Sequence, residues 1–300
     1  MNKKLTVKRV VIFCVLSFVP FWIIIPILNS VYGGPVYAVE SAYNATYLLG
    51  IFGMLIPAAA NLITRLVTKE GWKDSYLGLN IKGNGKYYAA AVLVILAEDV
   101  VAAFLICRVF LKEYTLRELF SGGSISWGLP VLLVQLAYAI ILFFPSFGEE
   151  WGWRGYLGPK LKELIGMPAS VIVGGIIWGL WHAPLTIAGH NFGTGYSFYP
   201  WLGIGYMCIM CIVMNAFLTL LTERTKSIYP ASFCHMVFDI VQPEILFLLF
   251  AGETGQKAFT DNLSYNTISW FPIFLISLAV TGVVSFLLLI RKGNSCKSDS

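Results

Sequence analysis

Charged residues are scarce in this 300-residue chain. Only 12% of the residues are Asp, Glu, Lys or Arg, whereas hydrophobic residues make up 57% even without the 28 glycines. Soluble domains carry about 25% charged residues, and a soluble fold of this size has too little polar surface to cover so many apolar side chains. The composition excludes a soluble enzyme and a disordered chain, and it indicates an integral membrane protein.

The sequence also lacks paired cysteine motifs and the His-Glu-x-x-His zinc motif. The six cysteines lie mostly within apolar runs, and the one C-x-x-C pair, Cys208 and Cys211, has no second pair to complete a zinc or disulfide framework. No His-Glu-x-x-His sequence occurs. These absences exclude a disulfide scaffold and the helical zinc motif of many metalloproteases.

Long apolar runs dominate the rest of the sequence. A membrane-spanning helix needs about 20 apolar residues, and Gly, Pro and charged residues divide the chain into eight such runs. We therefore expect an all-α polytopic membrane protein with about eight transmembrane helices in a single membrane domain, residues 1–300. The expected helices cover residues 10–29, 43–64, 87–107, 129–148, 168–188, 201–222, 228–251 and 268–290.

The basic residues are distributed unevenly between the two sides of the expected membrane. With a cytoplasmic N-terminus, 17 of the 21 Lys and Arg residues fall in cytoplasmic segments and four fall outside. This bias predicts a multi-pass protein of the cell membrane with both termini in the cytoplasm. The net charge of +5 therefore reflects topology, and we expect membrane lipid, and no nucleic acid, as a partner.

Ionisable residues within the apolar runs are candidates for function because burying them in a membrane is costly. In the stretch Glu149-Glu150-Trp-Gly-Trp-Arg154, the two carboxylates cannot share a helix face, whereas Arg154 lies four residues after Glu150 and can pair with it. This spacing leaves Glu149 without a local partner and predicts that it acts as a general base. An interfacial helix cap of mixed charge is the alternative interpretation.

Two histidines lie in further apolar runs. His182 follows Trp178 by four residues and His235 precedes Asp239 by four, so each pair lies on one helix face. A packed core histidine and a helix-internal hydrogen bond are the simpler interpretations of these pairs. Burying these polar groups and Glu149 costs free energy, and the cost is smallest if they meet in one polar cavity around a water molecule. A glutamate and a histidine beside one water are the arrangement of a hydrolase.

The three motifs and their order resemble those of the CPBP family of intramembrane proteases, which includes the CAAX prenyl endopeptidases. That family has Glu-Glu-x-x-x-Arg, then aromatic-x-x-x-His, then His-x-x-x-Asn or Asp. Two residues depart from the commonest pattern: Trp178 stands where phenylalanine is commoner, and Asp239 stands where asparagine is frequent. The resemblance places a protease core at about residues 129–251. The three motifs read Glu149-Glu150-Trp-Gly-Trp-Arg154, Trp178-Gly-Leu-Trp-His182 and His235-Met-Val-Phe-Asp239.

The resemblance implies hydrolysis of a peptide bond near the cytoplasmic membrane face, in a protein or peptide substrate with or without a lipid modification. Zinc bound by Glu149, His182 and His235 with one water is one implied mechanism, and a metal-free mechanism based on glutamate is the other. The implied roles are water activation by Glu149 and His182, oxyanion stabilisation by His235 and Asp239, and structural support by Glu150 and Arg154.

The predicted cavity opens to the cytoplasm and places Glu149 within one water molecule of both His182 and His235. The apolar run that holds His182 starts on the cytoplasmic side, and His182 lies well inside it. Glu149 and His182 therefore meet only if the chain breaks or re-enters the membrane near residues 150–165. Three glycines make such a break plausible, namely Gly148, Gly152 and Gly155.

Two functions other than proteolysis remain open from the sequence. A proton-coupled membrane transporter also uses buried acids and histidines. A non-catalytic membrane protein of the bacteriocin-immunity type is the other alternative.

Two further acids, Glu98 and Asp99, lie in the third apolar run without a basic residue or histidine within one turn. They are not assigned to the site.

Overall fold

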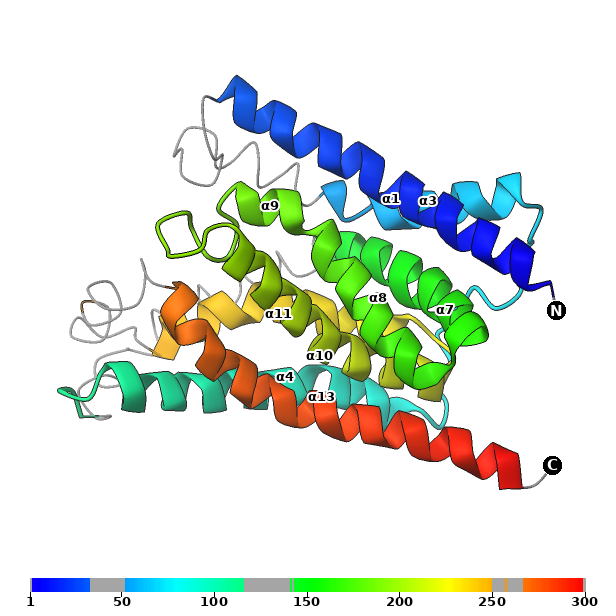
Figure 1. Ribbon diagram of the computed structural model, residues 1–300. Coiled ribbons are helices and arrows are strands. Elements are labelled where there is room, and N and C mark those ends of the chain that lie inside the picture. The colour runs from blue at the N-terminus through cyan, green and yellow to red at the C-terminus, as the bar shows by residue number, and fades with distance from the viewer. Residues whose placement is uncertain are drawn as a thin grey trace.

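The computed structural model describes residues 2–32, 52–115, 141, 143–249, 257 and 267–298. Within these ranges the chain is helical and has no β-strand, as the composition predicts. The helices are α1 (Lys3–Val31), α3 (Ile56–Val67), α4 (Gly85–Phe110), η2 (Trp153–Leu157), α7 (Gly158–Ile165), α8 (Met167–Trp181), α9 (Ala183–Ile187), α10 (Trp201–Thr225), α11 (Tyr229–Leu249) and α13 (Thr267–Ser298). In Figure 1, α1 and α3 lie along one edge of the bundle and α4 and α13 along the opposite edge.

Four of the described helices, α1, α4, α10 and α13, are long and apolar enough to cross a membrane. Each coincides with a predicted span, and α11 coincides with a fifth. The predicted spans 43–64 and 129–148 lie partly outside the described residues. The protein is therefore an all-α polytopic membrane protein, and the number of eight crossings stays a prediction.

The helix predicted over residues 168–188 is two helices, which corrects the prediction. α8 ends at Trp181, His182 lies at the junction, and α9 begins at Ala183. Pro184 explains the break, because proline has no N–H to donate to the carbonyl four residues earlier and its ring clashes with that carbonyl, whereas proline fits the first turn of a new helix. The break places His182 at a helix end.

α8 and α10 approach each other closely. A Cβ atom added at Gly175 would lie 2.8 Å from the backbone nitrogen of Ile212, and one added at Gly179 would lie 2.9 Å from that of Cys208. Small residues at such crossings are typical of membrane helices, because they let the backbones come together. Cys208 faces Gly179 in this interface, and both Cys208 and Cys211 are free cysteines.

α1 turns an apolar face away from the bundle. Val11, Val15 and Val19 are 54%, 52% and 48% exposed, whereas Phe13 and Phe21 are buried. An apolar face of this kind suits contact with lipid. The N- and C-termini lie at the same end of the bundle (Figure 1).

Candidate active site

The two carboxylates of the acidic motif lie at the end of a helical segment, residues 143–152, which continues into the π-helix η2 and then α7. A π-helical turn interrupts the regular α-helical hydrogen bonds and is frequent at functional sites. Glu149, Glu150 and Arg154 are 1%, 0% and 3% exposed. The chain is thus helical without interruption from residue 143 to residue 165, with a π-helical turn where the glycines predicted a break, and Glu149, Glu150 and Arg154 are buried.

Glu150 is the centre of a buried ionic cluster. Its Oε1 accepts hydrogen bonds from Nη1 of Arg154 at 2.8 Å and from Nδ1 of His235 at 2.8 Å. The ion pair predicted between Glu150 and Arg154 is confirmed, and His235 joins it from α11. Removal of one member of such a cluster leaves an uncompensated charge inside the protein.

Glu149 has partners that the sequence interpretation missed. Its Oε2 accepts hydrogen bonds from the indole nitrogen of Trp153 at 3.1 Å and from that of Trp178 at 2.7 Å. The prediction that Glu149 lacks a local partner was wrong, because it considered charged neighbours only, whereas Trp153 lies at i+4 on the same helix face. The two N–H groups fix the position of this carboxylate through one of its oxygens.

Trp178 connects His182 to Glu149. Nδ1 of His182 lies 2.9 Å from the backbone carbonyl oxygen of Trp178. Because a carbonyl only accepts, Nδ1 carries the proton, and Nε2 of the neutral ring is then an acceptor. The indole of the same tryptophan donates to Glu149. One residue therefore holds the carboxylate with its side chain and the imidazole with its backbone.

His235 lies between two carboxylates. Its Nδ1 faces Glu150, and its Nε2 lies 3.4 Å from Oδ2 of Asp239, whose side chain is 33% exposed. Ionised carboxylates only accept, so the doubly protonated ring satisfies both. The ring centroid of Trp178 lies 5.4 Å from that of His235 and 5.9 Å from that of His182. The structure thus brings both histidines to the indole that binds Glu149.

The zinc site expected from Glu149, His182 and His235 would require a neutral His235. A histidine that binds zinc directs an unprotonated nitrogen at the metal, but both nitrogens of His235 face carboxylates. In the described part of the chain, no group of three His, Cys, Asp or Glu side chains is placed to hold a metal ion. A doubly protonated His235 therefore favours the metal-free mechanism over the zinc mechanism.

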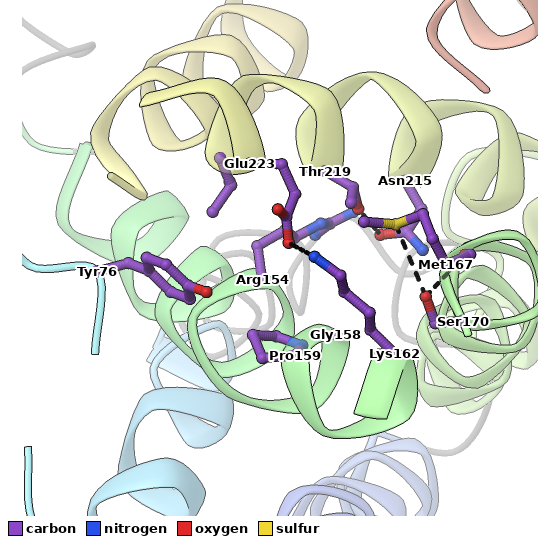
Figure 2. A pocket seen from close by; sticks show the side chains of 11 residues that line it. Tyr76, Arg154, Gly158, Pro159, Lys162, Met167, Ser170, Asn215, Thr219 and Glu223 are labelled. Carbon is purple, nitrogen blue, oxygen red and sulfur yellow. Dashed lines mark hydrogen bonds and ion pairs between the residues drawn. The ribbon is translucent and has the colours of Figure 1, made fainter. Parts of the chain in front are cut away.

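Arg154 extends from the ionic cluster to a small polar pocket (Figure 2). Its guanidinium lies over the ring of Trp178, 4.0 Å from the centroid, and points toward Thr219 in the figure. An ion pair of 2.8 Å joins Lys162 and Glu223 in the same pocket. Nε and Nη2 of Arg154 have no hydrogen-bond partner among the residues that the structure describes. The pocket of ≈ 20 Å³ has room for one water molecule.

Two further acids are buried in α4 and are not part of this cluster. Glu98 and Asp99 are 7% and 3% exposed. Thr281 of α13 faces the carboxylate of Glu98, and Oδ2 of Asp99 has no hydrogen-bond partner within the described ranges. No hydrogen bond there joins the two acids to the residues of the three motifs, so they stay outside the candidate site.

The fold and the site define a polytopic helical membrane protein with a buried cluster of carboxylates and imidazoles. The family model described as type II CAAX prenyl endopeptidase Rce1-like matches residues 130–241, which include all three motifs. The chain is also 25% identical over 212 residues to CAAX prenyl protease 2 of Methanococcus maripaludis, and the match covers 68% of this chain and 74% of that protein. These matches confirm the family resemblance predicted from the motifs, and they support a membrane protease.

Proposed function

We propose that this protein is an intramembrane endopeptidase that cleaves a membrane-associated protein or peptide near the cytoplasmic face, with a water molecule activated by Glu149 and His182. The family match supports endopeptidase activity. One observation carries the assignment of these two residues: Trp178 binds the carboxylate of Glu149 with its indole and Nδ1 of His182 with its carbonyl. A carboxylate and a neutral imidazole held by one buried residue can bind the same water.

The proposed reaction begins when Glu149 removes a proton from the water, whose other hydrogen is bound by Nε2 of His182. The water oxygen forms a bond to the carbonyl carbon of the substrate, and the π electrons of that carbonyl move to its oxygen. His235 donates its Nε2–H to the resulting oxyanion, while Glu150 holds Nδ1 in place. The carbon–nitrogen bond then breaks, and Glu149 returns its proton to the leaving amine.

Asp239 has a supporting role in this proposal. An ionised carboxylate cannot donate to an oxyanion, whereas it can orient and stabilise a protonated imidazole. The distance of 3.4 Å between its Oδ2 and Nε2 of His235 supports the second role. We infer that the Nε2–H, whose contact with Asp239 is long at 3.4 Å, donates mainly to the substrate oxygen as negative charge develops there.

The proposed location is the cell membrane, with both termini in the cytoplasm. The excess of basic residues in the loops assigned to that side supports this orientation, as does the position of the two termini at one end of the bundle. The relative is named a CAAX prenyl protease, which supports a lipid-modified protein or peptide as the substrate.

The test compares purified variants in lipid nanodiscs on fluorogenic peptides with and without a prenyl group. We expect Glu149→Gln to lower the cleavage rate by about 100-fold or more, because it removes the general base. Glu163→Gln is the matched control, because this glutamate lies on α7 and accepts from Thr6 at 2.7 Å. Unchanged cleavage by Glu149→Gln, or solute uptake without peptide cleavage, would contradict the proposal.

A further inference from the structure

The short helix α3 and the turn before it lie directly against the segment that carries the two motif carboxylates. A Cβ atom added at Gly148 would lie 3.0 Å from the carbonyl oxygen of Met54, and one added at Gly152 would lie 2.7 Å from that of Pro57. Both contacts involve backbone atoms, so side-chain rotation cannot relieve them. Gly148 and Gly152 are separated by one helical turn, and the carboxylates lie between them. The backbone of this segment is therefore pressed against α3.

Asn61 joins α3 to the same segment by a hydrogen bond. Its side chain is buried, and its Nδ2 donates to the backbone carbonyl of Trp151 at 2.9 Å. Its Oδ1 accepts from Nε of Arg65 at 2.7 Å, and Nη1 of Arg65 donates to the carbonyl of Gly71 at 2.8 Å. Because a guanidinium only donates, the amide oxygen must face Arg65 and the amide nitrogen must face Trp151. The orientation of Asn61 is thereby fixed.

The bond from Asn61 reaches the carbonyl of Trp151, which lies between the two carboxylates and the π-helix. Trp151 directly follows Glu150, and the π-helix begins two residues later. At the change from α- to π-helical winding the hydrogen-bond pattern shifts by one residue, so α-helical bonds alone do not fix the rotation of the segment. A hydrogen bond from a neighbouring helix to this carbonyl opposes rotation and thus keeps the two carboxylates pointing in one direction.

We propose that Asn61 is a positioning residue that aims Glu149 and Glu150, and that Arg65 holds Asn61 in the orientation this requires. The proposal rests on the proposed function, since it is the catalytic role of Glu149 that makes its direction matter. α3 lies outside the family match, which begins at residue 130. Asn61 acts through the backbone of Trp151 and contacts neither the water nor the peptide.

The kinetic test uses Asn61→Asp, which keeps the size of the side chain and the acceptor for Arg65 but removes the N–H donor. We expect kcat to fall by about 10- to 100-fold with KM changed by less than about twofold, because a misplacement of about 1 Å in a catalytic site costs about 100-fold. Thr64→Val is the matched control, because the buried hydroxyl of Thr64 donates within α3 to the carbonyl of Ala60 at 2.6 Å. That control should retain the kcat of the unmodified protein.

A second readout does not depend on catalysis. The indole N–H groups of Trp153 and Trp178 both donate to Glu149, so their ¹⁵N–¹H chemical shifts report the position of that carboxylate. We expect both signals to move in Asn61→Asp and in Asn61→Ala and to stay in place in Thr64→Val.

The outcomes separate positioning from simple structural support and from the proposed function itself. A lower Tm with unchanged indole signals and unchanged kcat per folded molecule would overturn the positioning role. If Glu149→Gln cleaves peptide as fast as the unmodified protein, the proposed function fails. Indole signals that move in the Asn61 variants would even then support the positioning of the carboxylates, and unmoved signals would overturn it.

Discussion

The indole of Trp178 donates a hydrogen bond of 2.7 Å to Oε2 of Glu149. The same ring carries the guanidinium of Arg154 on its face, 4.0 Å from the centroid. The residue thus provides both an N–H donor and an aromatic surface, and phenylalanine, which is commoner at this place in the motif, provides only the surface. The hydrogen bond to the carboxylate therefore depends on this chain having tryptophan there.

Trp178→Phe separates the two contributions, because it keeps an aromatic ring beside Arg154 and removes the donor to Glu149. A hydrogen bond to a charged group contributes about 1.5–3 kcal/mol, so we expect kcat to fall by about tenfold or more. Trp153→Phe removes the longer bond of 3.1 Å to the same oxygen and should have the smaller effect. Steady-state kinetics on both variants check this order, and the reverse order would contradict it.

Asp239→Asn and Asp239→Ala test the contact of this side chain with His235. The asparagine carbonyl still accepts from Nε2–H, so we expect the first variant to retain most of the activity. The alanine variant leaves that nitrogen without its partner at 3.4 Å, and we expect its kcat to fall by about tenfold or more. Equal activities of the two variants would show that orientation of His235 by this side chain is unimportant.

Glu150→Gln removes the charge at the centre of the ionic cluster. Arg154 and His235 both bind Oε1 of Glu150; in the variant Arg154 remains a buried cation without this counter-ion, and His235 keeps only Asp239. Breaking a buried pair in this way costs about 3–5 kcal/mol, so thermal unfolding in detergent should show a clear loss of Tm. Lys162→Gln breaks the more exposed pair with Glu223 and should change the Tm little. Similar Tm values for the two variants would contradict the prediction.

The ion pairs of Glu70 make a contribution to the stability of the fold that depends on pH. It lies in the loop after α3, accepts from the hydroxyl of Tyr156 at 2.9 Å, and forms ion pairs with Arg9 and Lys160. Burial acts to raise the pKa of Glu70, but the hydrogen bonds from Lys160 and Tyr156 and the positive charges of Lys160 and Arg9 outweigh it and hold the pKa below the ordinary value of 4.5. The stabilisation is therefore fully present above pH 4.5 and is lost as the pH falls through the lowered pKa.

Glu70→Gln should accordingly lower the Tm at neutral pH, and the difference from the unmodified protein should shrink as the solution is acidified. Thermal unfolding measured as a function of pH checks this. Glu113→Gln, at an exposed position after α4, is the control for removing a carboxylate and should leave the Tm little changed. A Glu70→Gln difference that grows on acidification would have the wrong sign.

The long helices could be predicted from the sequence because each is encoded by a local property. A run of about 20 apolar residues is sufficient for a span, as for α1, α4, α10 and α13. The break at His182 was missed because the apolar run continues across it, and Pro184 is the signal that marks it.

The contacts within one helix could also be predicted, and those between helices could not. Glu150 and Arg154 pair because they are four residues apart, whereas His235 binds Glu150 across 85 residues of sequence. Contacts of the second kind depend on how the helices cross. In a membrane protein the apolar pattern does not specify this, since lipid-facing and packed surfaces are both apolar. Asn61 illustrates the same limit, because a single polar residue in an apolar run does not indicate which helix it contacts.

Metal removal distinguishes the two mechanisms that the family resemblance implies. His235 directs one nitrogen to Glu150 and the other to Asp239, and a ring that donates from both nitrogens cannot coordinate zinc. We therefore expect cleavage to continue unchanged after treatment with EDTA or 1,10-phenanthroline, with a zinc-dependent protease treated in parallel as the control for chelation. Elemental analysis of the purified protein should find less than one zinc per chain. Loss of cleavage on chelation, with recovery when zinc is returned, would require one nitrogen of His235 to lose its proton, and it would replace the metal-free mechanism with the zinc mechanism.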